Sequence, residues 1–96
     1  MKNKKEKVIK KIEKNKNKLK ELNVKKIGLF GSILKNKKKP SDIDILVEFE
    51  NVNADNFFGL LFFLEKLFKT KVDLVDMNSI RKELKYVLGE AEYVQI

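Results

Sequence analysis

The sequence predicts an α/β (α+β) protein with a small mixed sheet of three to four strands flanked by helices. Residues 24–30 and 42–50 alternate apolar and polar side chains with the period of two that is typical of strands, and 71–77 form a further apolar run. The stretches beside them carry apolar residues at helical spacing. Because 96 residues suffice for one domain and not for two, a single domain over 1–96 is expected.

The first element is an amphipathic helix expected over residues 5–22. Its apolar side is formed by Val8, Ile12, Leu19 and Leu22. Asn23 is expected to end this helix. The strand at 24–30 then leads directly into Gly31 and Ser32.

Residues 33–41 are expected to form a short helix or turn followed by a solvated loop, which Pro40 interrupts. In the strand at 42–50, Asp42 and Asp44 lie on one face, and apolar residues occupy the opposite face. The apolar face is expected to be buried.

The rest of the chain is predicted to be helix, strand, helix and a short tail. Asn56 is expected to cap a helix that runs to about Lys69 and is apolar nearly all the way round. After the third strand, Ser79 is expected to cap a last helix that Gly89 ends, before the tail at 93–96. The predicted order is therefore αβ(α)βαβαβ.

The composition narrows the chemistry that this chain can perform. It contains no cysteine and no histidine, which excludes disulfides, zinc sites of the usual ligand types and imidazole acid-base catalysis. Carboxylates are the remaining good metal ligands. No stretch approaches the roughly 20 apolar residues that cross a bilayer, so we expect a cytoplasmic protein without membrane contact.

The formal charge of +8 is unevenly distributed along the chain. Residues 1–39 hold 16 lysines and three glutamates, which gives +13, and the remainder sums to −5. A basic half favours nucleic-acid binding. However, Arg81 is the single arginine, and nucleic-acid readers commonly use arginine, so a lysine-rich solvated surface is the preferred interpretation.

Two carboxylates two residues apart on a strand project from the same face and can share metal ions. Asp42 and Asp44 satisfy this spacing. The pair occurs often by chance, and two neighbouring features support it. One is Gly31-Ser32 at the end of a strand, where a glycine and exposed amides can admit a phosphate. The other is Asp73, which lies inside an apolar strand and would need a metal or cation if buried.

Asp76 competes with Asp73 for the role of third carboxylate. It falls on the opposite face and nearer the strand end, where aspartates are usually solvated or cap a helix. Asp73 is therefore the preferred third carboxylate.

The segment from the strand into Gly31-Ser32, followed by Ser-Asp-Ile-Asp at 41–44, resembles the signature of the DNA polymerase beta-type nucleotidyltransferase superfamily. Within it, the chain resembles the minimal nucleotidyltransferases (MNT), and the similarity extends to 71–75, the helix after them and the tail. The resemblance implies the nucleotidyltransferase fold. It also implies that Asp42, Asp44 and Asp73 bind magnesium, two ions in all, with Asp73 helping to activate the acceptor hydroxyl.

The same resemblance implies that Gly31 and Ser32 hold the triphosphate of ATP. Lys35 occupies the place where many members have an arginine, and supplies a positive charge without the bidentate fork. Many members are antitoxins beside a helical HEPN toxin and are implied to transfer AMP from ATP onto a tyrosine of that partner. The apolar helix at 56–69 is a candidate interface, with a partner or a second copy completing the pocket.

Two alternatives to this protein adenylyltransferase remain open. In one, the chain is a non-catalytic binding subunit that neutralises its partner by complex formation. In the other, it is a nucleotidyltransferase acting on RNA or a small molecule, with the lysine-rich half as a phosphate track. RNA is the less favoured partner.

Overall fold

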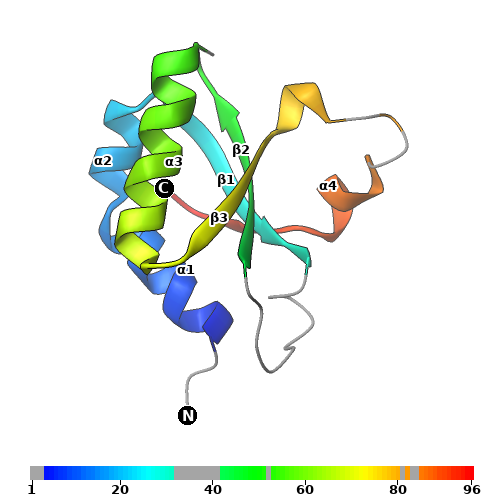
Figure 1. The fold of residues 1–96 in the computed structure, drawn as a ribbon. Helices are drawn as coiled ribbons and strands as arrows, with labels where there is room; N and C mark the ends of the chain where they lie inside the picture. Colours follow the sequence, from blue (N-terminus) through cyan, green and yellow to red (C-terminus); the bar gives the residue numbers. More distant parts are fainter. Residues whose placement is uncertain (1–3, 32–41, 52, 81, 83–84) are drawn as a thin grey trace.

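A four-stranded mixed sheet forms the centre of the computed structural model, which describes residues 4–31, 42–51, 53–80, 82 and 85–96 (Figure 1). The strands are β1 (Val24–Phe30), β2 (Asp42–Phe49), β3 (Lys71–Asp76) and β4 (Glu92–Val94). Their order across the sheet is β3-β2-β1-β4. Strand β1 is antiparallel to both β2 and β4, and β2 is parallel to β3. The mixed sheet expected from the sequence is confirmed.

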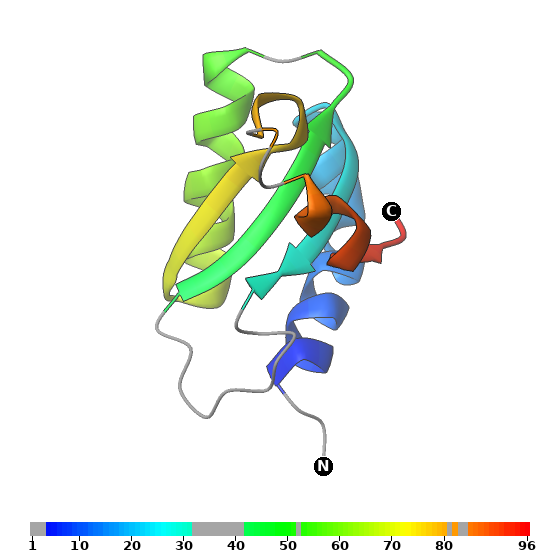
Figure 2. The same cartoon turned by 90° about the vertical axis from the view of Figure 1, so that its right-hand side faces the viewer.

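Helices cover the two faces of the sheet unequally. The helices are α1 (Lys4–Lys14), α2 (Lys16–Glu21), α3 (Ala54–Phe68), the 3-10 helix η2 (Met77–Ser79) and α4 (Tyr86–Glu90). Figure 1 shows α1, α2 and α3 packed on one face. Figure 2 shows the short α4 lying over the other face, which we call the open face. In the described part of the chain, no helix is both long and apolar enough to cross a membrane.

The hydrophobic core lies between the sheet and the helices α1 to α3. Its fully buried members include Ile12, Leu19, Ile27, Leu29, Ile43, Ile45, Val47, Leu60 and Leu64. These residues come from the apolar faces of the predicted strands and helices, so the period-two and helical patterns predicted the core correctly. Leu46 is also fully buried, although it lies on the open face, where η2 contacts β2.

The predicted first helix is divided into α1 and α2. The Asn15 side chain donates a hydrogen bond to the Lys11 carbonyl at 2.7 Å, and Asn15 is the residue between the two helices. Asparagine side chains compete in this way with helical hydrogen bonding. The end predicted at Asn23 is confirmed, because Asn23 has φ 64° and β1 begins at the next residue.

Helix α3 is capped by Asn53, and the prediction of Asn56 as its cap was wrong. The Asn53 side chain accepts a hydrogen bond from the Asn56 backbone N–H at 2.7 Å. Asn53 has the extended backbone that is typical of a cap residue. Asn56 therefore lies in the first turn of the helix and donates its backbone N–H to the cap. At the other end, Lys69 has φ 54° and terminates the helix as predicted.

The predicted last helix does not begin at Ser79, because Ile80 has an extended backbone. Ser79 ends η2 and does not cap a long helix, and α4 contains Gly89 within its range. Asp76 caps η2 by accepting a hydrogen bond from the Asn78 N–H at 3.0 Å, so the chain turns immediately after β3. The tail forms β4, which is the final strand of the predicted order.

Candidate active site

Strand register places Asp44 and Asp73 side by side on the open face. The two residues are Cα partners in the parallel pair of β2 and β3. Neighbouring strands lie about 4.8 Å apart, and partners in register project from the same face. The two aspartates are 29 positions apart in the sequence, and the sheet makes them neighbours.

Asp73 is exposed, so the sequence argument from the cost of burying its carboxylate does not apply. Exposed and buried residues alternate along β3, with Asp73 exposed between the buried Val72 and Leu74. Because β3 is an edge strand and α4 lies over other strands, none of the described helices covers the open face at this position (Figure 2). Asp73 is a candidate third carboxylate because it lies beside Asp44 in the sheet.

Gly31 lies directly against the Asp44 carboxylate. It follows β1, and its φ of 76° is in the left-handed region that favours glycine. A Cβ atom at this position would collide with a carboxylate oxygen of Asp44 and lie 3.0 Å from its Cγ. The glycine is thus required both by its backbone conformation and by the closeness of Asp44, which the sequence alone did not reveal.

Asp42 precedes Asp44 by two residues on β2, and its backbone therefore belongs to the same face. Its Cα partner in β3 is Lys71. The structure describes the backbone of Asp42 but not its side chain. Ser32 and Lys35 lie outside the described residues, and their roles remain predictions.

Asp76 is separated from these carboxylates. It pairs with Val47, a core residue, and so belongs to the face that α1, α2 and α3 cover. Its side chain caps η2, which is the role that sequence reasoning favoured.

Tyr93 secures the segment that covers part of the open face, and sequence reasoning assigned it no role of its own. Its hydroxyl donates a hydrogen bond to the Leu88 carbonyl at 2.7 Å, which joins β4 to α4. Its ring lies over Gly28, where an added Cβ would come within 2.7 Å of the ring, and the Lys26 ammonium is 4.5 Å from the ring centroid. An aromatic residue paired with a glycine in the neighbouring strand could have indicated this contact.

The surroundings of Tyr93 favour its neutral form. Burial, with a smaller contribution from the Glu48 carboxylate, raises the pKa of the phenol above its ordinary value of 10.0. Tyr93 is therefore a hydrogen-bond donor at neutral pH.

The donor set at this face suits a hard divalent cation. Carboxylate oxygens are the ligands that Mg²⁺ prefers, and Asp44 and Asp73 bring two carboxylates to neighbouring positions. Among the described side chains, which omit Asp42, no group of three or more potential ligands gathers at one point. With Asp42 on the same face as Asp44, the residues fit such an ion.

Known proteins resemble this chain in sequence. The sequence model of the family described as Polymerase beta, Nucleotidyltransferase matches residues 6–92. The protein adenylyltransferase MntA of Thermococcus cleftensis is 42% identical over 74 residues, which are 74% of this chain and 75% of that protein.

Two solved structures share the fold. A chain of a toxin-antitoxin structure with AMP-PNP is 26% identical with a TM-score of 0.62, and the match covers 96% of this chain and 71% of that one. A chain from the complex of a tri-AMPylated Shewanella oneidensis HEPN toxin with an MNT antitoxin is 28% identical with a TM-score of 0.55. That match covers 86% of this chain and 69% of the other.

Proposed function

Because the chain belongs to the polymerase beta nucleotidyltransferase family, we propose that it is a metal-dependent protein adenylyltransferase that transfers AMP from ATP to a tyrosine of a HEPN toxin. The observation that carries the proposal is the register of Asp44 and Asp73, with Gly31 packed against the Asp44 carboxylate. The name of the Thermococcus relative and the AMPylated toxin in the Shewanella complex support AMP as the transferred group and a toxin as acceptor.

In this proposal, Asp42, Asp44 and Asp73 hold the magnesium ions, with two ions expected. When bound, the ions neutralise the phosphates and lower the pKa of the attacking hydroxyl. Asp73 helps to activate the tyrosine of the partner by accepting the proton of its phenolic hydroxyl. The phenolic oxygen then bonds to the α-phosphorus of ATP, the bond from that phosphorus to the oxygen bridging the β-phosphate breaks, and pyrophosphate leaves.

Gly31, Ser32 and Lys35 bind the triphosphate. Gly31 leaves the backbone open to a phosphate oxygen, and the Ser32 hydroxyl and nearby amides donate hydrogen bonds to it. Lys35 contributes a point charge. The toxin-antitoxin structure with AMP-PNP, an analogue of ATP, supports a nucleoside triphosphate as donor. We place the reaction in the cytoplasm, with residues 1–96 acting as a single domain.

The proposal can be tested with ATP labelled at the α-phosphate and a purified HEPN toxin as the acceptor. Asp44→Asn and Asp73→Asn should each reduce AMP transfer at least about 10²-fold, because each removes a negatively charged ligand of the magnesium ions that stabilise the transition state. Glu50→Gln is the matched control, because Glu50 is an exposed carboxylate beyond the far end of β2 and should leave transfer unchanged. Unaltered transfer by both aspartate variants would refute the proposed chemistry.

The same variants distinguish the enzyme from a binding subunit. Asp44→Asn combined with Asp73→Asn should lose the ability to relieve toxicity in cells while still binding the partner. Complete neutralisation by this double variant would instead assign the chain a stoichiometric role.

A further inference from the structure

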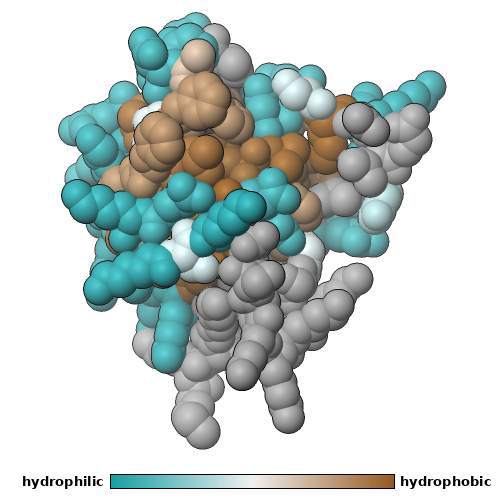
Figure 3. Space-filling model, in the orientation of Figure 1, coloured by the Kyte–Doolittle hydropathy of each residue, from teal (hydrophilic) through white to brown (hydrophobic). Residues whose placement is uncertain are grey.

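Helix α3 exposes a pair of aromatic rings to solvent. Phe58 is 51% exposed and Phe62 is 64% exposed, and their rings stack with centroids 6.4 Å apart. Phe57 packs edge-on against Phe58 at 5.5 Å. Figure 3 shows that the apolar surface over α3 continues towards the middle of the same face. Contiguous exposed apolar surface of this kind marks an interaction site.

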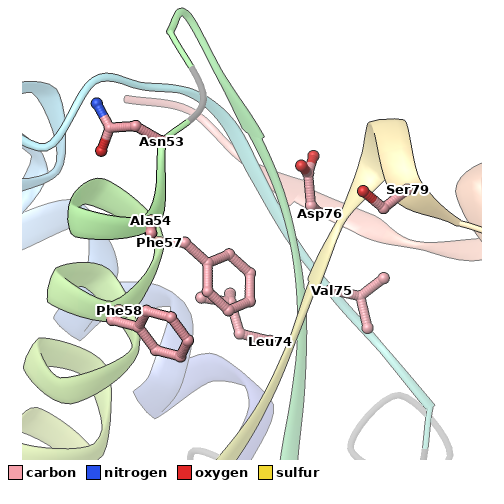
Figure 4. Close-up of a pocket in the computed structure, with 8 residues that line it drawn as sticks. All are labelled: Asn53, Ala54, Phe57, Phe58, Leu74, Val75, Asp76 and Ser79. Atoms are coloured by element: carbon pink, nitrogen blue, oxygen red, sulfur yellow. The ribbon is translucent and has the colours of Figure 1, made fainter.

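A groove connects this helix to the edge of the sheet (Figure 4). It encloses about 430 Å³ and is lined by Asn53, Ala54, Phe57, Phe58, Leu74, Val75, Asp76 and Ser79. Leu74 belongs to the core face of β3 and Val75 to the open face. The groove therefore extends around the edge strand, from the α3 side of the sheet to the side that carries the candidate active site.

The backbone of β3 is available along this groove. The Val72 N–H donates to the Glu65 carboxylate at 3.1 Å, and so points out of the sheet. Backbone groups alternate along a strand, which directs the N–H of Leu74 outward as well. Glu65 thus covers the outward amide at the start of β3. Among the described residues no strand pairs with the outer edge of β3 beside the groove, and such an edge can accept another strand.

The groove adjoins the candidate active site. Asp73 and Val75 lie on the same face of β3, two residues apart, which corresponds to about 7 Å along a strand. A segment seated in the groove therefore lies beside the Asp44 and Asp73 pair. A second copy of this chain is a poor occupant, because each copy carries a formal charge of +8.

We propose that this groove docks the protein that receives the nucleotide, through an extended apolar segment that pairs with β3 as a further strand. Its apolar side chains contact Phe57, Phe58 and Leu74, and its backbone pairs with the outward groups of β3. This placement holds the acceptor tyrosine beside Asp73. The identity of the acceptor rests on the proposed function, and the location of the docking site rests on the groove.

The test measures binding separately from catalysis. An Asp44→Asn chain is titrated with the same purified HEPN toxin, and the dissociation constant is compared with that of the Asp44→Asn chain that also carries Phe58→Ser. We expect Phe58→Ser to weaken binding at least about tenfold, because apolar anchors at interface centres dominate affinity. Tyr86→Ser is the matched control, since Tyr86 is 61% exposed and lies outside the groove.

Hydrogen exchange supplies a second measurement. Binding should slow exchange of the Leu74 amide, whereas the Val72 amide, already bonded to Glu65, should change little. Exchange of the free Phe58→Ser chain should match that of the parent, which establishes that the fold is intact.

Unchanged affinity of the Phe58→Ser chain, or unchanged exchange at Leu74, would overturn the docking site. A dimer of the free chain that Phe58→Ser abolishes would assign the groove to a second copy and would also overturn it. If the parent chain binds through the groove but wild-type protein transfers no AMP, the proposed function fails and the docking site stands.

Discussion

Replacing Gly31 with alanine should damage the active site more than the fold. A side chain at φ 76° costs about 1–2 kcal/mol, because Cβ crowds the following carbonyl. The added Cβ would also collide with a carboxylate oxygen of Asp44, and either the loop or the carboxylate must move. Since Gly31 follows the end of β1 and Asp44 is only partly buried, we expect the movement to be local.

The two consequences have separate measurements. For a domain of 60–100 residues, each kcal/mol lowers the melting temperature by about 4–8 °C, so Gly31→Ala should melt about 4–16 °C below wild type. AMP transfer should fall by about 10²-fold, because misplacing a catalytic group by about 1 Å has an effect of that size.

Gly89→Ala provides the control for both measurements. Gly89 lies within α4, and no atom of the described part of the chain lies within 4 Å of the position of an added Cβ. This variant should be neutral or slightly stabilising and fully active. Wild-type AMP transfer and stability in Gly31→Ala would show that the close approach of Gly31 to Asp44 is not needed for function.

Three further predictions concern other parts of the molecule. Tyr93→Phe removes the hydrogen bond to Leu88 and should lower the free energy of unfolding by about 1 kcal/mol in urea denaturation. Because the Tyr93 pKa is raised in the folded state, its contribution is complete below about pH 10 and is lost at higher pH. Wild type should therefore lose stability above pH 10 more steeply than Tyr93→Phe, and parallel curves would contradict this. Asn53→Ala should lower the free energy of unfolding by about 0.5–2 kcal/mol, because it removes the helix cap, and Asn56→Ala should lower it less. Equal losses in urea denaturation would contradict the assignment of Asn53 as the cap. Chelating divalent cations should abolish AMP transfer, and Mg²⁺ should restore it, while transfer in excess chelator would exclude metal dependence.

The strands of this fold could be predicted because their sequence patterns reflect burial directly. Strand β1 has its predicted bounds, and the predicted second strand differs from β2 by one residue. In both, the apolar side that α1 to α3 cover alternates with the open side. The same period-two alternation predicts that Asp42 and Asp44 lie on one face of the strand, whichever strands lie beside it.

Features that depend on tertiary contacts could not be predicted from the sequence. The exposure of Asp73 follows from the position of β3 at the edge of the sheet, which an apolar run does not reveal. Both Asn53 and Asn56 could cap α3, because asparagine is favoured at helix N-termini. Only the backbone conformation in the structure shows that Asn53 is the cap. The contact of Gly31 with Asp44 arises from the antiparallel pairing of β1 and β2, in which Phe30 is opposite Asp44.

The short connection between α3 and β3 couples the position of the helix to the position of the strand. Only Lys69 and Thr70 separate the end of α3 from the start of β3, so the helix has little freedom to shift along its axis without displacing the strand. A movement of one helical turn, about 5.4 Å, would carry Asp73 nearly two residues away from Asp44 along the sheet. The length of α3 therefore acts as a spacer that sets the alignment of the two carboxylates. Insertions or deletions within this helix should misalign the active site even where they leave a folded protein.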